Sequence, residues 1–366
     1  MWKHYALGIG VSLLAGYFFI KAVDLEQMAR AFGQMNPLWL VPAVGLYLLA
    51  YLMRALRWGI LLRPVARLKL GGLWRAMWIG FLGNNLLPAR LGEVVRAVVL
   101  GRSEGLSASS ALATVVLERI YDGLTILGML LVVLLWMPLP EGRAEFMSRE
   151  NLRLAGWAAL LFFAGAMGVM YLLRWQRGRV RGLLEGLCRP LPEAWGRKVV
   201  EIAGKFADGI GVLNPGELAL VGLTSIGLWA ALVMWAWVVM EAFGIDVGVM
   251  GAVLMEVVLA LALIIPSAPA FIGTFHLGAA ATLKYLGVAP GLAGSCAMVL
   301  WVVHFGCTSL MGLWYLWRSG LEWGVVLGRG GGAVAREQGA VAERGAERQR
   351  RWNETVSESV AGEGKG

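Results

Sequence analysis

The sequence predicts an all-α polytopic membrane protein with about six full spans and two broken, oppositely oriented helical hairpins. Three observations support this: 58% of the 366 residues are hydrophobic and only 16% are charged, the mean hydropathy is +0.67, and polar segments containing proline interrupt the apolar runs at about residues 84–96 and 266–276. A soluble core stops growing near ~250–300 residues, after which chains split into domains. No soluble domain boundary appears, so we place the chain in lipid.

The candidate full spans are apolar runs of the required length. A bilayer core ~30 Å thick needs ~20 helical residues. Such runs cover residues 5–23, 38–56, 120–138, 154–173, 218–242 and 292–317. The first run lacks an A-x-A-like cleavage site and is interpreted as a retained helix rather than a signal peptide.

Two further apolar regions are too short to span. At 1.5 Å per residue, residues 73–87 provide about 22 Å of helix before Pro88, and residues 249–265 provide about 25 Å before Pro266. Each is followed by a second short helical stretch, 91–100 and 271–286. We interpret the regions of about 73–100 and 249–286 as re-entrant hairpins.

Basic residues orient the chain. Residues 54–75 carry six basic residues and no acid, and residues 174–205 carry eight against three acids. The positive-inside rule therefore predicts a cell-membrane protein with both termini cytoplasmic. The two hairpins then enter from opposite sides with their breaks facing each other, which suggests an inverted repeat around a midplane transport site. The halves share no sequence identity, so the repeat is a hypothesis from hydropathy.

The domain organisation follows the same composition. Residues 1–318 form one predicted transmembrane domain. After Arg318 the chain becomes rich in glycine and charge, which predicts a disordered cytoplasmic tail over residues 319–366. The chain has no GxxxxGK[ST] or HExxH motif, and its match to GxSxG at residues 101–105 does not lie in the strand–turn–helix context of a nucleophile elbow. We therefore expect no cofactor, no metal, no nucleic-acid partner and no enzymatic activity, and no transport powered by ATP binding in this chain.

The densest polar motif is GFLGNNLLPARLGEVVRAVVLGR, over residues 80–102. Asn84 and Asn85 can satisfy non-helical backbone at membrane depth. Arg90, Glu93 and Arg96 recur every three residues and are predicted to share one helix face. Two arginines flanking a glutamate suit a phosphate or carboxylate. The alternative is an interfacial helix whose arginines contact lipid phosphates nonspecifically.

A second motif, LERIYD, contains Glu118, Arg119 and Asp122 directly before an apolar run. Glu118 and Asp122 are four residues apart and share a face. If they are buried, these charges must pair with one another or with Arg90 or Arg96. A functional role and ordinary structural pairing both fit this pattern.

The second interruption lies in LALIIPSAPAFIGTFHLGAA, over residues 261–280. The helix that starts near Phe271 directs its N-terminus toward the break, which favours an anionic group there. The polar side chains of this segment are Ser267, Thr274 and His276. The histidine could move protons or serve as a structural hydrogen-bond donor, and both interpretations stay open.

Glu256 and the RALRW motif complete the candidates. Glu256 lies in an otherwise uncharged apolar stretch, where a carboxylate is a functional candidate by default. It could equally be neutral, or paired with Arg57 or another basic group. The RALRW motif, residues 54–58, is interpreted as a helix end whose arginines snorkel to the membrane surface.

At these motifs the chain resembles the lysylphosphatidylglycerol synthase transmembrane region family of flippase-like membrane proteins. The matching pieces are RALRW, GNNLLPARLGEVVRA, LERIYD and IPSAPAFIGTFH, in that order, and they cover about residues 5–317. The resemblance implies two re-entrant elements and lipid handling without lipid synthesis, because the cytosolic catalytic domain of the full-length synthase is absent. One departure is His276, where many relatives carry a glutamate.

We therefore expect a lipid translocase that moves an anionic or phosphate-bearing headgroup through a polar groove, with Arg90 and Arg96 holding the phosphate. Its expected partner is a membrane phospholipid or a polyprenyl-phosphate-type lipid. Two alternatives remain: a membrane-embedded transferase with Glu93 or Asp122 as base, and a scaffold for an enzyme of a lipid-linked glycan or hopanoid pathway. Oligomer formation stays open.

Overall fold

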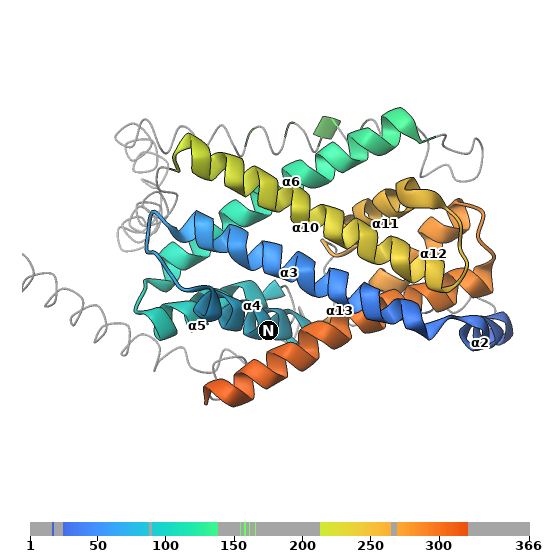
Figure 1. Cartoon of the computed structure of the whole chain (residues 1–366), viewed down its shortest axis with the longest axis horizontal. Helices are drawn as coiled ribbons and strands as arrows, with labels where there is room; N and C mark the ends of the chain where they lie inside the picture. The colour runs from blue at the N-terminus through green and yellow to red at the C-terminus, as the bar shows by residue number, and fades with distance from the viewer. Residues whose placement is uncertain are drawn as a thin grey trace, which may run out of the picture.

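The computed structural model describes residues 25–87, 90–137, 213–264 and 269–320, together with Tyr17 and a few single positions between 154 and 165. The described part is a helical bundle (Figure 1). This confirms the predicted all-α class. In chain order its helices are α2 (Leu25–Gln34), η1 (Pro37–Trp39), α3 (Leu40–Leu62), α4 (Leu70–Leu86), α5 (Gly92–Glu104), α6 (Ala108–Trp136), α10 (Pro215–Ala242), α11 (Gly248–Ala262), η4 (Pro269–Phe271), α12 (Thr274–Tyr285) and α13 (Pro290–Ser319).

Three described helices are long and apolar enough to cross a membrane, namely Pro37–Leu62, Gly216–Ala242 and Pro290–Ser319. They coincide with the predicted spans 38–56, 218–242 and 292–317, and the predicted span 120–138 overlaps α6, which ends at Trp136. The predicted spans 5–23 and 154–173 lie outside the described residues except at single positions, and so does the tail from residue 321. The total number of spans therefore stays a prediction.

The helices follow the same order twice. A long helix, two short helices around an interruption and a second long helix appear first as α3, α4, α5 and α6, and again as α10, α11, α12 and α13. The α3 and α10 helices are antiparallel, because Asn36 N–H donates to the Ala242 carbonyl at one end and Arg63 pairs with Glu217 at the other.

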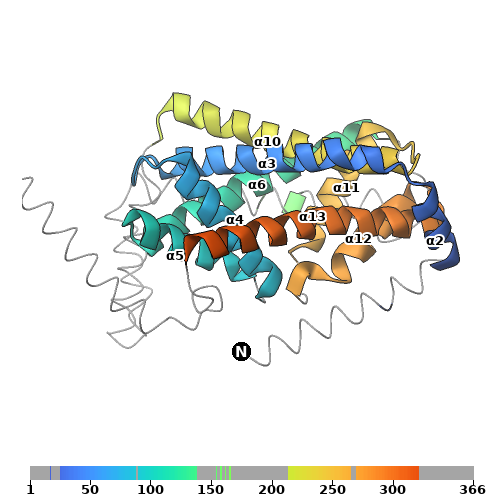
Figure 2. The ribbon, with the colours of Figure 1, turned by 60° about the horizontal axis from the view of Figure 1, so that its bottom comes forward.

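The two short-helix hairpins approach from opposite ends of the bundle, and their tips lie near its middle (Figure 2). Each hairpin also packs on the last long helix of the other half: α4 packs on α13, and α11 packs on α6. Their order and direction agree with the hypothesis of an inverted repeat.

Glycines bring α4 and α5 into backbone contact. A Cβ atom on Gly80 would lie 2.9 Å from the Gly92 carbonyl oxygen, and one on Gly83 would lie 2.9 Å from the Gly92 Cα. Only glycine at these positions permits so close an approach. The contact fixes the first turn of α5, which carries Glu93.

We expect Gly92→Ala to destabilise the protein by about 1–3 kcal/mol, because the added methyl group would overlap the Gly80 carbonyl and the Asn84 backbone. The control is Gly45→Ala in α3, where a Cβ would meet nothing within 4 Å. Alanine there should be neutral or stabilising, by up to ~1 kcal/mol. Chemical unfolding in detergent compares the two, and equal effects would contradict the close contact between α4 and α5.

Candidate functional site

A group of buried charges joins α3, α5 and α6. Arg54 and Arg57 are three residues apart on α3, and Glu118 and Asp122 are four apart on α6, so each pair shares a helix face. The full set, here called the arginine–carboxylate cluster, is Arg54, Arg57, Glu93, Arg96, Glu118, Arg119 and Asp122.

Glu118 is the centre of the cluster. Its side chain is fully buried and lies within ion-pairing distance of four arginines. The nitrogen–oxygen distances are 3.2 Å to Arg54, 3.6 Å to Arg57, 3.1 Å to Arg96 and 2.5 Å to Arg119. One carboxylate thus holds together arginines from three helices.

Asp122 extends the cluster toward α10. It pairs with Arg57 at 2.6 Å and accepts a hydrogen bond from the indole N–H of Trp229 at 3.3 Å. Arg57 also donates to the Ser225 hydroxyl at 3.0 Å. The long helix of the second half therefore contributes polar partners to charges carried by the first half.

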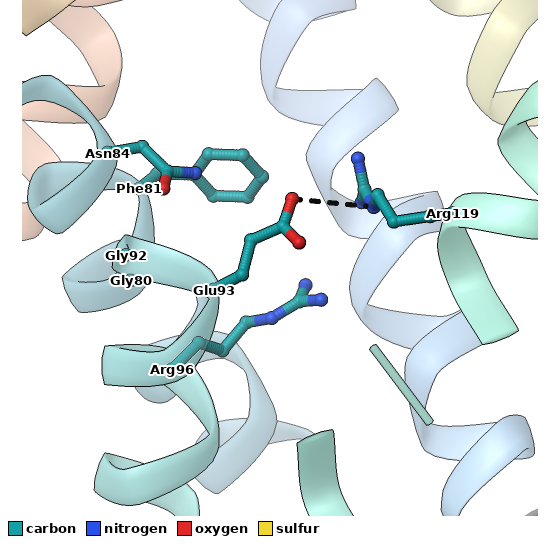
Figure 3. A pocket seen from close by; sticks show the side chains of 7 residues that line it. All are labelled: Gly80, Phe81, Asn84, Gly92, Glu93, Arg96 and Arg119. Atoms are coloured by element: carbon teal, nitrogen blue, oxygen red, sulfur yellow. Dashed lines mark ion pairs between the residues drawn. The ribbon is translucent and has the colours of Figure 1, made fainter. Parts of the chain in front are cut away.

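One side of the cluster faces a small hollow (Figure 3). Glu93 and Arg96 of α5 point toward Arg119 of α6, and the Glu93 carboxylate lies 3.6 Å from the Arg119 Nε. The hollow has a volume of about 10 Å³, which is room for about one water molecule and far below the ~300 Å³ of a typical small-molecule pocket. It therefore has room for a single polar group such as a phosphate oxygen, and not for a whole lipid. Its lining residues are Gly80, Phe81, Asn84, Gly92, Glu93, Arg96 and Arg119.

Several donors in the cluster have no acceptor among the described residues. Nε and Nη1 of Arg96 are buried and make no hydrogen bond, although the guanidinium lies 4.4 Å from the centre of the Trp58 ring. Nε of Arg119 likewise makes no hydrogen bond, and its ion pair with Glu93 is long, at 3.6 Å. Buried donors without acceptors are costly, so an oxygen-rich anion in the hollow would lower the free energy of these groups.

The two interruptions are in direct contact. Arg90, at the first break, donates to the Leu263 carbonyl at 2.6 Å, and its guanidinium lies 5.6 Å from the centre of the Phe271 ring. Among the described residues, the non-glycine positions with positive φ are Arg90, Ala270 and Phe271. Such strained backbone is concentrated at functional sites. In the described part of the chain it occurs only where the two hairpins meet.

Arg90 corrects one prediction. It does not share a helix face with Glu93 and Arg96, because α5 begins at Gly92 and Arg90 precedes it with a φ of 55°. Its side chain therefore reaches the second interruption, while Arg96 reaches Glu118. Of the two arginines suggested as partners for Glu118 and Asp122, only Arg96 pairs with Glu118.

Two substitutions of Arg90 distinguish the stability that its side-chain contacts provide from the cost of its strained backbone. We expect Arg90→Ala to lower the free energy of unfolding by about 1.5–3 kcal/mol, the value of a hydrogen bond from a charged donor. Arg90→Gly should cost about 1 kcal/mol less, because glycine adopts a positive φ without strain. Chemical unfolding of both variants in detergent is the measurement. A glycine variant less stable than the alanine variant would contradict the strained conformation.

The other predicted polar residues of the first break divide between two places. Asn84 lines the hollow. Asn85 instead points to α13, where its amide donates to Thr308 at 2.8 Å and to Ser309 at 2.9 Å. Asn85 thus connects the first hairpin to the last helix and does not line the hollow.

At the second break, Thr274 and His276 have local structural contacts. The Thr274 hydroxyl donates to the Phe271 carbonyl at 3.2 Å, and Nδ1 of His276 accepts from the Gly273 N–H at 3.4 Å. The His276 ring lies 5.2 Å from that of Trp301. Ser267 lies outside the described residues. Neither Thr274 nor His276 lines the hollow beside Arg119.

Glu256 lies apart from the cluster. It is 5% exposed on α11, and its Oε1 atom makes no hydrogen bond to a described residue. The suggested pairing with Arg57 is wrong, because Arg57 is occupied by Asp122 and Glu118. The described residues contain no group of three or more histidine, cysteine, aspartate or glutamate side chains that could hold a metal ion.

Arg54 and Arg57 were missed as site residues. The sequence suggested a helix end at the membrane surface, but α3 continues to Leu62, so these arginines lie about two turns inside it and are 7% and 0% exposed. One signal in the sequence could have identified them. LERIYD has more acidic than basic residues, so its buried carboxylates require basic partners from another helix.

The comparisons with known proteins agree with this architecture. The family model described as "Lysylphosphatidylglycerol synthase TM region" matches residues 5–312. No solved structure matches the chain.

Among curated relatives, "Glycosyltransferase AglD" of Haloferax volcanii is 25% identical over 318 residues, covering 80% of this chain but only 50% of AglD. Two proteins of Methanothermobacter thermautotrophicus, each named "UPF0104 membrane protein", are 24% and 23% identical and cover 83% and 75% of this chain, with 92% and 82% of their own lengths matched. The chain is thus a multi-pass membrane protein that belongs to the lysylphosphatidylglycerol synthase transmembrane region family.

Proposed function

We propose that this protein moves a phosphate-bearing lipid headgroup between the leaflets of the cell membrane, with the hollow beside Arg119 as its headgroup site. The observation that carries the proposal is a charge imbalance. In the arginine–carboxylate cluster, four arginines face three carboxylates. One positive charge is left over, and a phosphate would balance it.

The geometry supports a headgroup path at the meeting point of the two hairpins. Interrupted helices from oppositely oriented halves leave backbone polar groups that line a path for polar substrates. The headgroup would enter the hollow while the hydrocarbon chains stay in the bilayer. There the phosphate would replace Glu93 as a partner of Arg119, while buried Glu118 would keep the arginines in place between turnovers.

The test is a headgroup-accessibility assay in proteoliposomes that contain the full chain. The panel contains phosphatidylglycerol, a polyprenyl phosphate and a neutral glycolipid with the same acyl chains as the phosphatidylglycerol. We expect the protein to accelerate movement of at least one phosphate-bearing lipid and not of the glycolipid. Rates equal to those of protein-free vesicles for every phosphate lipid would overturn the proposal.

A membrane-embedded transferase is the second candidate, and the name of the chain's relative AglD, a glycosyltransferase, favours it. In this chain Glu93 suits the role of base better than Asp122, because Glu93 lines the hollow and is 23% exposed, whereas Asp122 is buried among three arginines. Incubation of purified protein with lipid-phosphate sugar donors tests this candidate. A glycosylated product that disappears in Glu93→Gln would establish it in place of translocation.

A further inference from the structure

A second, larger groove is lined by α3, α10 and the start of α4. The α3 and α10 helices run side by side in both views of the bundle (Figures 1 and 2). The groove has a volume of about 640 Å³, and the segment between α3 and α4 contributes Arg67 and Leu68 to its lining. Its lining is mostly aliphatic: Ala55, Leu56, Gly59, Ile60, Arg63, Arg67, Leu68, Leu70, Leu73, Leu220 and Thr224.

The two charged residues of this groove are both arginines. Arg63 is exposed and pairs with Glu217 at 3.4 Å, while the Glu217 carboxylate also accepts from the Asn214 N–H at the start of α10. Arg67 is exposed and has no ion pair with a described residue. The groove thus combines an apolar wall with a net positive end, which is complementary to a lipid that has an anionic headgroup.

The groove lies across α3 from the arginine–carboxylate cluster. Arg54 and Arg57 point into the cluster, while Leu56 and Gly59 line the groove. On α10, Thr224 lines the groove and the next residue, Ser225, accepts the hydrogen bond from Arg57. A lipid in the groove would therefore lie one helix away from the headgroup site.

We propose that this groove binds one anionic glycerophospholipid, with an acyl chain along the aliphatic wall and the phosphate at Arg63 and Arg67. The site is separate from the headgroup hollow, and it stands whether or not the protein moves lipids. It is at the end of α3 that carries the basic segment of residues 54–75, which the positive-inside rule assigns to the cytoplasmic leaflet.

The experiment is photolabelling in proteoliposomes. Phosphatidylglycerol and phosphatidylcholine, each with a diazirine on one acyl chain, are crosslinked to the full-length protein, and labelled peptides are mapped by mass spectrometry. The measured quantity is the ratio of phosphatidylglycerol to phosphatidylcholine labelling on residues 55–73 and 220–224. The reference is the same ratio on α13, where Leu310 is 70% exposed.

We expect the ratio to be at least about fivefold higher in the groove than on α13, since one basic residue near a lipid surface contributes about that factor. Arg67→Gln should reduce the preference about fivefold, and Thr224→Trp should reduce groove labelling by either lipid because it fills the space. The matched control is Leu223→Trp, at a neighbouring position that is 65% exposed and outside the groove.

Equal ratios in the groove and on α13 would show ordinary annular lipid and overturn the proposal, as would equal loss of labelling in the two tryptophan variants. Competition by glycerophosphoglycerol, which has the headgroup but no acyl chains, would show a free phosphate site instead. Arg119→Gln lies outside the groove and should leave labelling unchanged. Failure of headgroup movement alone therefore leaves this proposal intact.

Discussion

Replacing Glu118 with glutamine should lower the free energy of unfolding by about 3–5 kcal/mol, the cost of breaking a buried ion pair by neutralising one partner. Glu118 is fully buried among four arginines. Glutamine keeps the size of the side chain but removes the negative charge. Chemical unfolding in detergent measures the loss.

Glu217→Gln is the matched control for this substitution. Among the described residues Glu217 pairs only with Arg63, whose side chain is 43% exposed, and glutamine can preserve the capping box at the start of α10. Exposed pairs of this kind contribute about 0–1 kcal/mol. If both variants lost the same stability, the buried cluster would not be the electrostatic centre of the fold.

Arg119→Gln should slow headgroup movement by about 10- to 100-fold, because a hydrogen bond from a charged donor contributes about 1.5–3 kcal/mol. Arg119 is the one arginine of the cluster that is substantially exposed, at 31%, and it lines the hollow with Glu93. The accessibility assay in proteoliposomes measures the rate for the best substrate of the panel.

Arg30→Gln provides the control for charge loss. Arg30 pairs with Glu26 on α2, and both side chains are exposed, at 66% and 84%. Its substitution should leave the rate unchanged. A normal rate in folded Arg119→Gln protein would remove Arg119 from the headgroup path.

The sequence predicted the short helices and both interruptions to within a few residues, but it placed no helix over α2 (Leu25–Gln34), and the predicted span 120–138 begins twelve residues after α6 (Ala108–Trp136) does. An apolar run that ends at a proline indicates both the length of a helix and the place where it stops. The predicted stretch 73–87 corresponds to α4 (Leu70–Leu86), and 249–265 corresponds to α11 (Gly248–Ala262). The contact between the breaks also followed from topology, since Arg90 meets Leu263 and Phe271.

The partners of the charges could not be predicted in the same way. The end of an apolar run does not show where a helix ends, so Arg54 and Arg57 were assigned to the surface although α3 continues beyond them. Likewise, the spacing of three residues predicted that Arg90 shares a face of α5 with Glu93 and Arg96. The positive φ of Arg90 breaks this arrangement, and it leaves no pattern in the sequence. Pairing between distant helices depends on packing that local patterns do not contain.

The central claim, that surplus positive charge in the hollow holds a phosphate group, is tested most directly by binding. Native mass spectrometry of the full-length protein with a short-chain phosphatidylglycerol would compare wild type, Glu93→Gln and Arg119→Gln. We predict tighter binding in Glu93→Gln, because this substitution removes the carboxylate that competes with the phosphate for Arg119. In Arg119→Gln we predict binding that is at least about tenfold weaker. Affinities that are equal in all three proteins, or that change in the reverse order, would contradict the claim.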